Sequence, residues 1–161
     1  MEQFFGQASR RAGIVLSVVL GVLGSRVPAL AALGQPLASV EDDRAQMEGT
    51  RSEAQAPDYV VHRIQAPTGT IVEEWVSQDG TVFAVSWHGP FVPNLHQLLG
   101  AYYPALADEI KREPARPRRR GAVLVQRDDL VIETGGHMRA FVGRAYIPSR
   151  LPQSLRQGGL P

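Results

Sequence analysis

The stretch YVVHRIQAPTGTIVEEWVSQDGTVFAVSWH, residues 59–88, decides the fold. It holds three runs rich in β-branched and aromatic residues, which predict strands over 59–66, 70–77 and 81–88. Pro67-Thr68-Gly69 and Gln78-Asp79-Gly80 separate the runs, and such three-residue segments with glycine are typical of hairpin turns. The stretch therefore predicts three consecutive antiparallel strands.

The third of these runs has the pattern of a central strand. Alternate residues of a strand point to opposite faces of the sheet. This alternation predicts two sets on opposite faces, Phe83, Val85 and Trp87 on one and Val82, Ala84 and Ser86 on the other. Both sets are largely apolar or small, so we expect this strand to be covered on both sides.

Upstream of the three runs, the sequence predicts one short helix and a linker. Ser39 is placed to cap the helix, and Gly49 is placed to end it. Residues 50–57 are polar and predict a linker without regular structure.

Downstream, Asn94 is placed to cap a second helix, with Gln97 three residues later as in a capping box. One apolar stripe follows at helical spacing: Leu95, Leu98, Leu99, Tyr102, Leu106 and Ile110. Pro104 should kink this helix, or end it and begin another, near Tyr103. Residues 113–120 (EPARPRRR) predict an exposed linker.

A second set of strands is predicted over 122–127, 130–134 and 138–147, with a firm turn at Gly135-Gly136. The order β-β-β-α-β-β-β predicts an α+β fold, an antiparallel sheet of about five to six strands with one or two helices on one face. Residues 32–148 would form this single domain, and 149–161 a flexible C-terminal tail.

The first 31 residues predict a secretory signal peptide. Arg10 and Arg11 precede the run AGIVLSVVLGVLG (residues 12–24), which is too short to span a bilayer but fits the apolar core of a signal. Small residues at Ala29 and Ala31 suit signal peptidase, so we expect cleavage near Ala31-Ala32. The mature chain would be periplasmic or secreted and would contain no transmembrane segment.

Composition narrows the possible chemistry. The chain contains no cysteine, which excludes disulfides, thiol catalysis and cysteine-ligated metals. Loss of residues 1–31 removes three arginines and one glutamate, so the net charge changes from +1 to −1. Residues 32–113 are acidic and 114–161 basic, and we expect the two parts to attract each other within one fold. We interpret Arg118-Arg119-Arg120 as a solvated linker and expect no nucleic-acid partner.

Candidate binding residues gather in the segment GGHMRAF, residues 135–141. His137, Arg139 and Arg144 together offer a base and two guanidinium groups, which suit a carboxylate or phosphate. The alternative is an ordinary hairpin turn. Among the aromatic residues we single out Trp87 and Phe91, the latter on a proline-flanked loop that could form a binding surface.

Motifs for catalysis are missing. There is no nucleophile elbow, phosphate loop, dinucleotide fingerprint or calcium loop, and adjacent Glu73 and Glu74 point to opposite faces of a strand. A three-histidine zinc site at His88, His96 and His137 lacks supporting spacing. We therefore predict no catalytic residues, no metal and no cofactor. Whether the protein is an enzyme stays open, and we favour a protein that is not one.

Three stretches carry a family resemblance: GTVFAVSWHGP (80–90), LLGAY (98–102) and GGHMRAFVGRAY (135–146). On these motifs the chain resembles a family of exported proteobacterial proteins catalogued as domain of unknown function 2844, over about residues 33–148. The resemblance implies a small periplasmic or secreted protein and implies no activity.

We therefore favour an exported cell-envelope protein that binds or helps to assemble an envelope protein partner without catalysis. One alternative is a small-ligand binder or hydrolase that uses His137 with Arg139 and Arg144. A weaker alternative is a peptidase inhibitor with residues 89–93 as its inserting loop.

Overall fold

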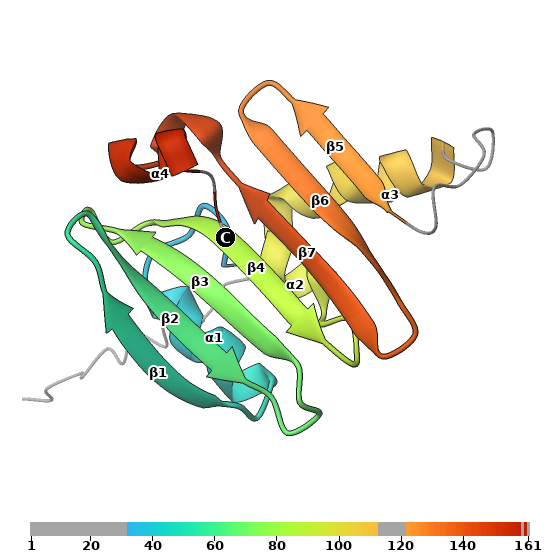
Figure 1. Cartoon of the computed structure of the whole chain (residues 1–161), viewed down its shortest axis with the longest axis horizontal. Helices are drawn as coiled ribbons and strands as arrows, with labels where there is room; N and C mark the ends of the chain where they lie inside the picture. Colours follow the sequence, from blue (N-terminus) through green and yellow to red (C-terminus); the bar gives the residue numbers. More distant parts are fainter. Residues whose placement is uncertain (1–31, 113–121, 159, 161) are drawn as a thin grey trace, which may run out of the picture.

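The computed structural model describes residues 32–112, 122–158 and 160. The predicted signal peptide and the linker with three arginines lie outside these residues. Figure 1 shows the elements, whose bounds are α1 (Ala38–Gln46), β1 (Thr50–Gln55), β2 (Tyr59–Gln65), β3 (Ile71–Ser77), β4 (Val82–Gly89), α2 (Leu95–Leu99), η1 (Gly100–Tyr102), α3 (Tyr103–Arg112), β5 (Val123–Arg127), β6 (Leu130–His137), β7 (Ala140–Tyr146), η3 (Pro148–Arg150) and α4 (Gln153–Gly158).

The strands form one antiparallel sheet in the order β1-β2-β3-β4-β7-β6-β5. The predicted α+β class with an antiparallel sheet is confirmed, but the sheet has seven strands rather than five or six. The three strands predicted from residues 59–88 are β2, β3 and β4, in consecutive antiparallel pairing. The strand β4 lies at the centre of the sheet, as its two covered faces predicted.

The missed strand is β1, which we predicted as a linker. All six of its residues are exposed, and it pairs along its whole length with β2. An edge strand needs only one set of backbone hydrogen bonds and no apolar face. Hydrophobic alternation, the signal that identified the other strands, is therefore absent from its sequence.

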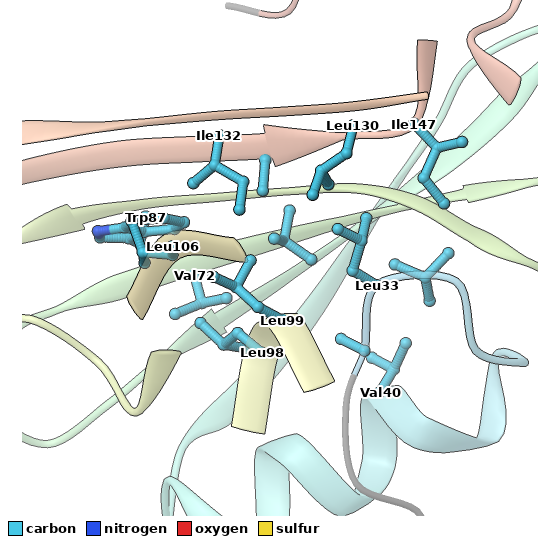
Figure 2. Packing of buried hydrophobic residues seen from close by; sticks show 14 of the residues in the cluster. Leu33, Val40, Val72, Trp87, Leu98, Leu99, Leu106, Leu130, Ile132 and Ile147 are labelled. Carbon is cyan, nitrogen blue, oxygen red and sulfur yellow. The ribbon is translucent and has the colours of Figure 1, made fainter. Parts of the chain in front are cut away.

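Helices α1, α2 and α3 cover one face of the sheet, which we call the helix face (Figure 1). Its core joins residues from these helices to residues from the strands and from the segment before α1 (Figure 2). Leu33 is buried, and its amide donates to the carbonyl of Leu98. The residues just before α1 are therefore part of the packed structure.

The opposite face, which we call the open face, is covered by a helix only in part. Leu155 of α4 and Leu160 pack there against Trp75, Phe83 and Ala84. We predicted a flexible tail at 149–161, but its described residues form η3 and α4 and bury two leucines. The tail prediction followed the Pro, Gly and Ser content and missed these two apolar anchors.

A β-bulge changes the predicted faces of β4. Val82 pairs with Val76 and Ala84 pairs with Trp75, which leaves Phe83 as the extra residue. Phe83 consequently packs on the open face, whereas Val82, Val85 and Trp87 belong to the helix-face core. The predicted alternation is wrong at Phe83 and Val82 because one inserted residue reverses the faces of everything before it.

Helices are present in both predicted regions, but only the cap predicted for the helix after β4 is correct. Asn94 caps α2, its side chain accepting from the amide of Gln97, and the helix is interrupted before α3 begins at Tyr103. By contrast, the N-cap of α1 is Leu37, which makes no side-chain cap. Ser39 lies inside α1, where its hydroxyl donates to the Pro36 carbonyl at 2.9 Å.

The turn predicted at Gly135-Gly136 lies three residues further on. Both glycines continue β6, paired with Val142 and Phe141, and the turn is Met138-Arg139. A Cβ on Gly136 would stand 2.2 Å from the Ala140 carbonyl oxygen, so this strand position excludes any side chain. Gly136 is needed for close backbone approach, which the sequence pattern cannot distinguish from a turn.

Candidate functional site on the open face

One row of directly paired positions crosses the open face from β2 to β6. We call it the polar row, and its members are Arg63, Glu73, Ser86, Arg144 and Glu133. Side chains of paired residues in adjacent strands lie on the same face of a sheet. The strand register therefore brings together residues that are up to 81 positions apart in the sequence.

The charges of the polar row are paired within the row. The Arg63 guanidinium donates to Glu73 at 2.6 and 2.9 Å, and Ser86 adds a longer contact to Glu73 at 3.4 Å. Arg144 approaches Glu133 at 2.8 Å through both Nε and Nη2. Its Nη1 donates to the carbonyl of Leu160 at 2.6 Å, which ties the C-terminal segment to the sheet.

Beside this row lies a groove of about 800 Å³, which we call the open-face groove. Two aliphatic side chains are exposed in it, Leu124 on β5 at 54% and Val142 on β7 at 55%. The groove extends over the strands from β2 to β5 in sheet order and is lined by Arg63, Glu73, Ser86, Trp87, His88, Ala122, Val123, Leu124, Glu133, Thr134, Gly135, Val142, Gly143 and Arg144. It therefore offers apolar surface beside charges that are already neutralised.

Glycine shapes the sheet under this groove. A Cβ on Gly143 would stand 2.2 Å from the indole of Trp87, so the bare backbone lets that ring pack tightly. Trp87 is 1% exposed and belongs to the helix-face core. This predicted binding residue thus supports the sheet beneath the groove and presents no ring to a ligand.

The structure does not bring the predicted triad of His137, Arg139 and Arg144 together. His137 and Arg139 are exposed at the end of the β6–β7 hairpin, and Arg139 occupies a turn position with a φ of 64°. Arg144 lies opposite Glu133, whereas His137 lies opposite Ala140 at the hairpin end. Of the three residues, only Arg144 lines the open-face groove.

Phe91 is exposed on the loop after β4, at 58%. The loop is held by Thr70, whose hydroxyl donates to the Phe91 carbonyl at 2.9 Å and accepts from its amide at 3.3 Å. These bonds hold the loop to the start of β3, but Phe91 is not among the residues that line the groove.

A buried pair of carboxyl groups on the helix face was missed by sequence analysis. Glu74 on β3 is 0% exposed, and neither of its carboxyl oxygens has a well-aligned hydrogen-bond partner among the described residues. Burial raises its pKa to about 9, and the nearby Asp43 carboxyl on α1 raises it further by charge repulsion. Burial likewise raises the pKa of Asp43 to about 6, although the amide of Gln97 donates to it.

No sequence spacing links these two carboxyls, because α1 and β3 meet only in the folded chain. Glu73, the neighbour of Glu74, lies on the open face in the polar row, as the strand alternation predicted. Neither Glu74 nor Asp43 lines the open-face groove. A protonated Glu74 held beside Asp43 is therefore a structural group in the core.

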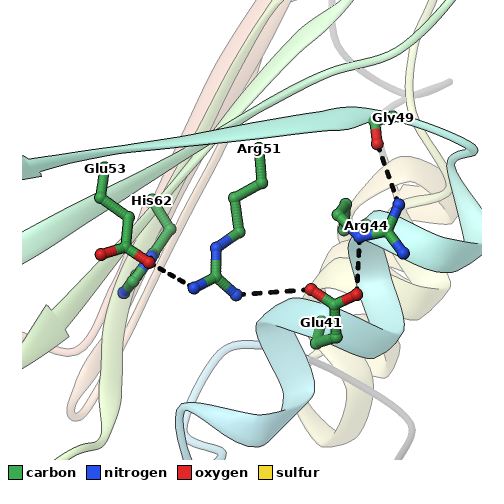
Figure 3. A network of polar contacts seen from close by, with 6 residues as sticks. All are labelled: Glu41, Arg44, Gly49, Arg51, Glu53 and His62. Atoms are coloured by element: carbon green, nitrogen blue, oxygen red, sulfur yellow. Dashed lines mark hydrogen bonds and ion pairs between the residues drawn. The ribbon is translucent and has the colours of Figure 1, made fainter.

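Further charged residues join α1 to the outer strands (Figure 3). Glu41 pairs with Arg44 at 2.7 Å and with Arg51 at 3.5 Å, and Arg51 also contacts Glu53. His62 lies 3.3 Å from Glu53 without hydrogen-bond alignment, and burial, then the charge of Arg51, lower its pKa. These contacts hold the edge of the sheet to α1.

Among residues 32–112, 122–158 and 160, no cluster of three or more His, Cys, Asp or Glu side chains is arranged to hold a metal ion. Nor does this part of the chain contain a helix with the length and apolar character needed to cross a membrane.

The model of one protein family, described as "Protein of unknown function (DUF2844)", matches residues 29–158. This range contains all three motifs on which the resemblance was based. No curated protein and no solved structure is detectably similar to the chain.

Proposed function

The chain belongs to the family described as protein of unknown function (DUF2844), and this description assigns no role. From the surface of the chain itself, we propose that it is an exported, non-catalytic protein that binds an apolar segment of an envelope protein partner. The observation that carries this proposal is the open-face groove, with exposed Leu124 and Val142 beside internally paired charges.

Charge pairing supports an apolar occupant over an anionic one. A bound carboxylate or phosphate would have to replace Glu73 or Glu133 as the partner of an arginine. The displaced carboxylate would remain beside the bound anion and repel it, so the exchange would bring no net gain in charge pairing. Burying Leu124 and Val142 instead gains about 25 cal/mol for each Å² of apolar surface covered.

The positions of the titratable groups support a non-catalytic role. His137 is exposed at a hairpin end away from Arg144, so base and guanidinium do not face one bound atom. The carboxyls with raised pKa lie in the core, and a general acid or base must reach its substrate within hydrogen-bond distance.

Export is supported by the sequence features of residues 1–31 and is compatible with the packing after them. Ala32 and Leu33 are core residues, so cleavage beyond Leu33 would remove a buried side chain. Cleavage near Ala31-Ala32 would keep every described residue in the mature protein.

Photo-crosslinking in the producing bacterium tests the binding role. Benzoylphenylalanine replaces Val142 or Leu124 in the groove and, as a control, the exposed Ala45 on α1 across the sheet. We expect both groove positions to yield adducts with the same protein and Ala45 to yield none of it. The purified partner should then bind Val142→Asp at least about tenfold more weakly than the unchanged chain.

Equal adducts at Ala45, or equal affinity for Val142→Asp, would refute the groove as the binding surface.

Export has its own test. Residues 1–31 fused to a reporter that is active only outside the cytoplasm should give activity, and loss of Arg10, Arg11 and the apolar run should abolish it. Amino-terminal sequencing of the exported chain should begin at Ala32 or within one residue of it.

A further inference from the structure

The strand β5 forms the outer edge of the sheet next to the open-face groove. Among the described residues it pairs only with β6, and no other described residue hydrogen-bonds to its backbone. Its sequence, VLVQR, contains three branched aliphatic residues in five positions. A strand edge of this composition is a template on which another strand can pair.

The opposite edge of the same sheet is protected. All residues of β1 are exposed and polar or small, with Arg51 and Glu53 among them, and both of these are engaged in ion pairs. Charged side chains on an edge strand are a common way to prevent pairing with another chain. The two edges therefore differ in chemistry, and only β5 has the character of a covered edge.

Apolar side chains are exposed on both sides of β5. Leu124 is 54% exposed on the open face. On the helix face, α3 packs against β5, and its Ile110 is 48% exposed although Leu106, one turn earlier on the same stripe, is fully buried. The core thus continues to the β5 edge, and no residue of the described part of the chain covers it there.

We infer that β5 is covered by the β5 of a second copy of this chain, paired antiparallel about a two-fold axis at Val125. This register uses all five residues and places Leu124 opposite the second copy's Gln126, and Val123 opposite its Arg127. Antiparallel partners share a face, so both open faces would lie on the same side of a continuous sheet.

The charge of the strand does not oppose pairing with a second copy. Arg127 is its only charged residue, and it approaches Asp108 on α3 at 3.9 Å within its own chain. No like charges meet across the two-fold axis in this register. The pairing also completes the groove, because Leu124 at the outer wall gains the second copy's Gln126 beside it.

Two double variants of the mature chain test this inference. Leu124→Lys with Gln126→Lys places lysine opposite lysine twice, and like charges directly opposite destabilise a strand pair. Leu124→Lys with Gln126→Glu alters the same positions but places opposite charges across the axis. As a control for added charge, Ser52→Lys with Ala54→Lys alters exposed residues of β1.

Sedimentation equilibrium measures the association of each protein, and circular dichroism confirms that each is folded. We expect dimers for the unchanged chain, the Lys/Glu variant and the β1 control, and association at least about tenfold weaker for the Lys/Lys variant. A monomeric unchanged chain at about 0.1 mM, or equal association of the Lys/Lys and Lys/Glu variants, would overturn the inference.

This inference extends the proposed function but is tested separately from it. A monomer that still forms the groove-specific adduct at Val142 would refute the pairing and leave the binding role intact. A dimer that forms no adduct at Val142 would refute the binding role and leave the pairing of β5 intact.

Discussion

The two faces of the sheet are formed by the same strands but differ in burial and in charge. On the helix face, neighbouring residues such as Glu74 and Val85 are fully buried, and burial there raises the pKa of Glu74 to about 9. On the open face, the Glu73 carboxylate accepts from the Arg63 guanidinium at 2.6 Å. The comparison indicates that the larger core lies on the helix face, whereas the open face carries the groove that we propose as the binding surface.

The C-terminal segment divides the open face again. Leu155 and Leu160 cover the aromatic half around Trp75 and Phe83. The other half, beside the polar row, has no such cover among the described residues and forms the groove. Arg144 lies between the covered and the uncovered half of the open face, since it donates to both Glu133 and the Leu160 carbonyl.

The strongest test of the comparison is the removal of a large side chain from the helix-face core. Trp87→Ala should lower the free energy of unfolding by about 3–5 kcal/mol, because the substitution leaves a cavity between β4 and the helices. Chemical denaturation measures this loss. Phe91→Ala, which removes an exposed ring from the following loop, should change stability by less than about 0.5 kcal/mol. Equal losses would contradict the assignment of the core.

The second test uses pH to separate the faces. Glu74 ordinarily has a pKa of 4.5 but titrates at about 9 in the fold. The folded chain therefore holds a proton that the unfolded chain releases, and stability should fall as pH rises through this window and level off above 9. Between pH 7 and 9 we expect a loss of about 2 kcal/mol, measured by urea unfolding.

Glu74→Gln is the matched control, since the amide keeps the shape and remains neutral. Its stability should be nearly flat between pH 7 and 9. The lowered pKa of His62 acts with opposite sign and mainly below pH 6.5, and the raised pKa of Asp43 acts up to about pH 6, so neither disturbs this range. An equal slope in both proteins would show that Glu74 is not the group responsible.

The third test loosens the border between the two halves of the open face. Arg144→Lys keeps the charge but loses the planar fork that holds Glu133 and Leu160 together. We expect a loss of about 1 kcal/mol and faster hydrogen exchange in α4. Arg139→Lys in the exposed hairpin turn should leave both quantities unchanged. Unaltered exchange in α4 would mean that Arg144 does not anchor the segment.

The smallest effect is expected within the polar row itself. Arg63 is largely exposed, so its pair with Glu73 should contribute about 0–1 kcal/mol. A double-mutant cycle with Arg63→Ala and Glu73→Ala measures the coupling free energy. A coupling comparable to the loss in Trp87→Ala would remove the contrast between the two faces.

Much of the fold followed from local pattern. The runs at 59–66, 70–77 and 81–88 predicted β2, β3 and β4, and Asn94 with Pro104 predicted where α2 begins and where the helix breaks. These signals are local because strand alternation, glycine turns and helix caps depend on residues a few positions apart. The sequence of β1 carries no such signal, because this edge strand is held by backbone hydrogen bonds to β2 alone and needs no apolar face.

The candidate site was predictable only in part. Arg144 was selected from sequence, but its companions in the polar row were not, because register across five strands cannot be inferred from any one of them. The bulge at Phe83 shifted the predicted strand faces by one residue, and the turn lies three residues beyond the predicted Gly135-Gly136. Such shifts do not alter the class of fold, but they change which side chains meet.

The sequence by itself determined the α+β class, the central position of β4, the helix break at Tyr103 and the family, since each depends on nearby residues or on a contiguous motif. The tertiary structure alone decided that Glu74 meets Asp43, that Arg144 pairs with Glu133 and Leu160, and that one half of a sheet face stays uncovered. The physical reason is that burial and charge pairing depend on distances through space, which the chain establishes only when all seven strands are in register.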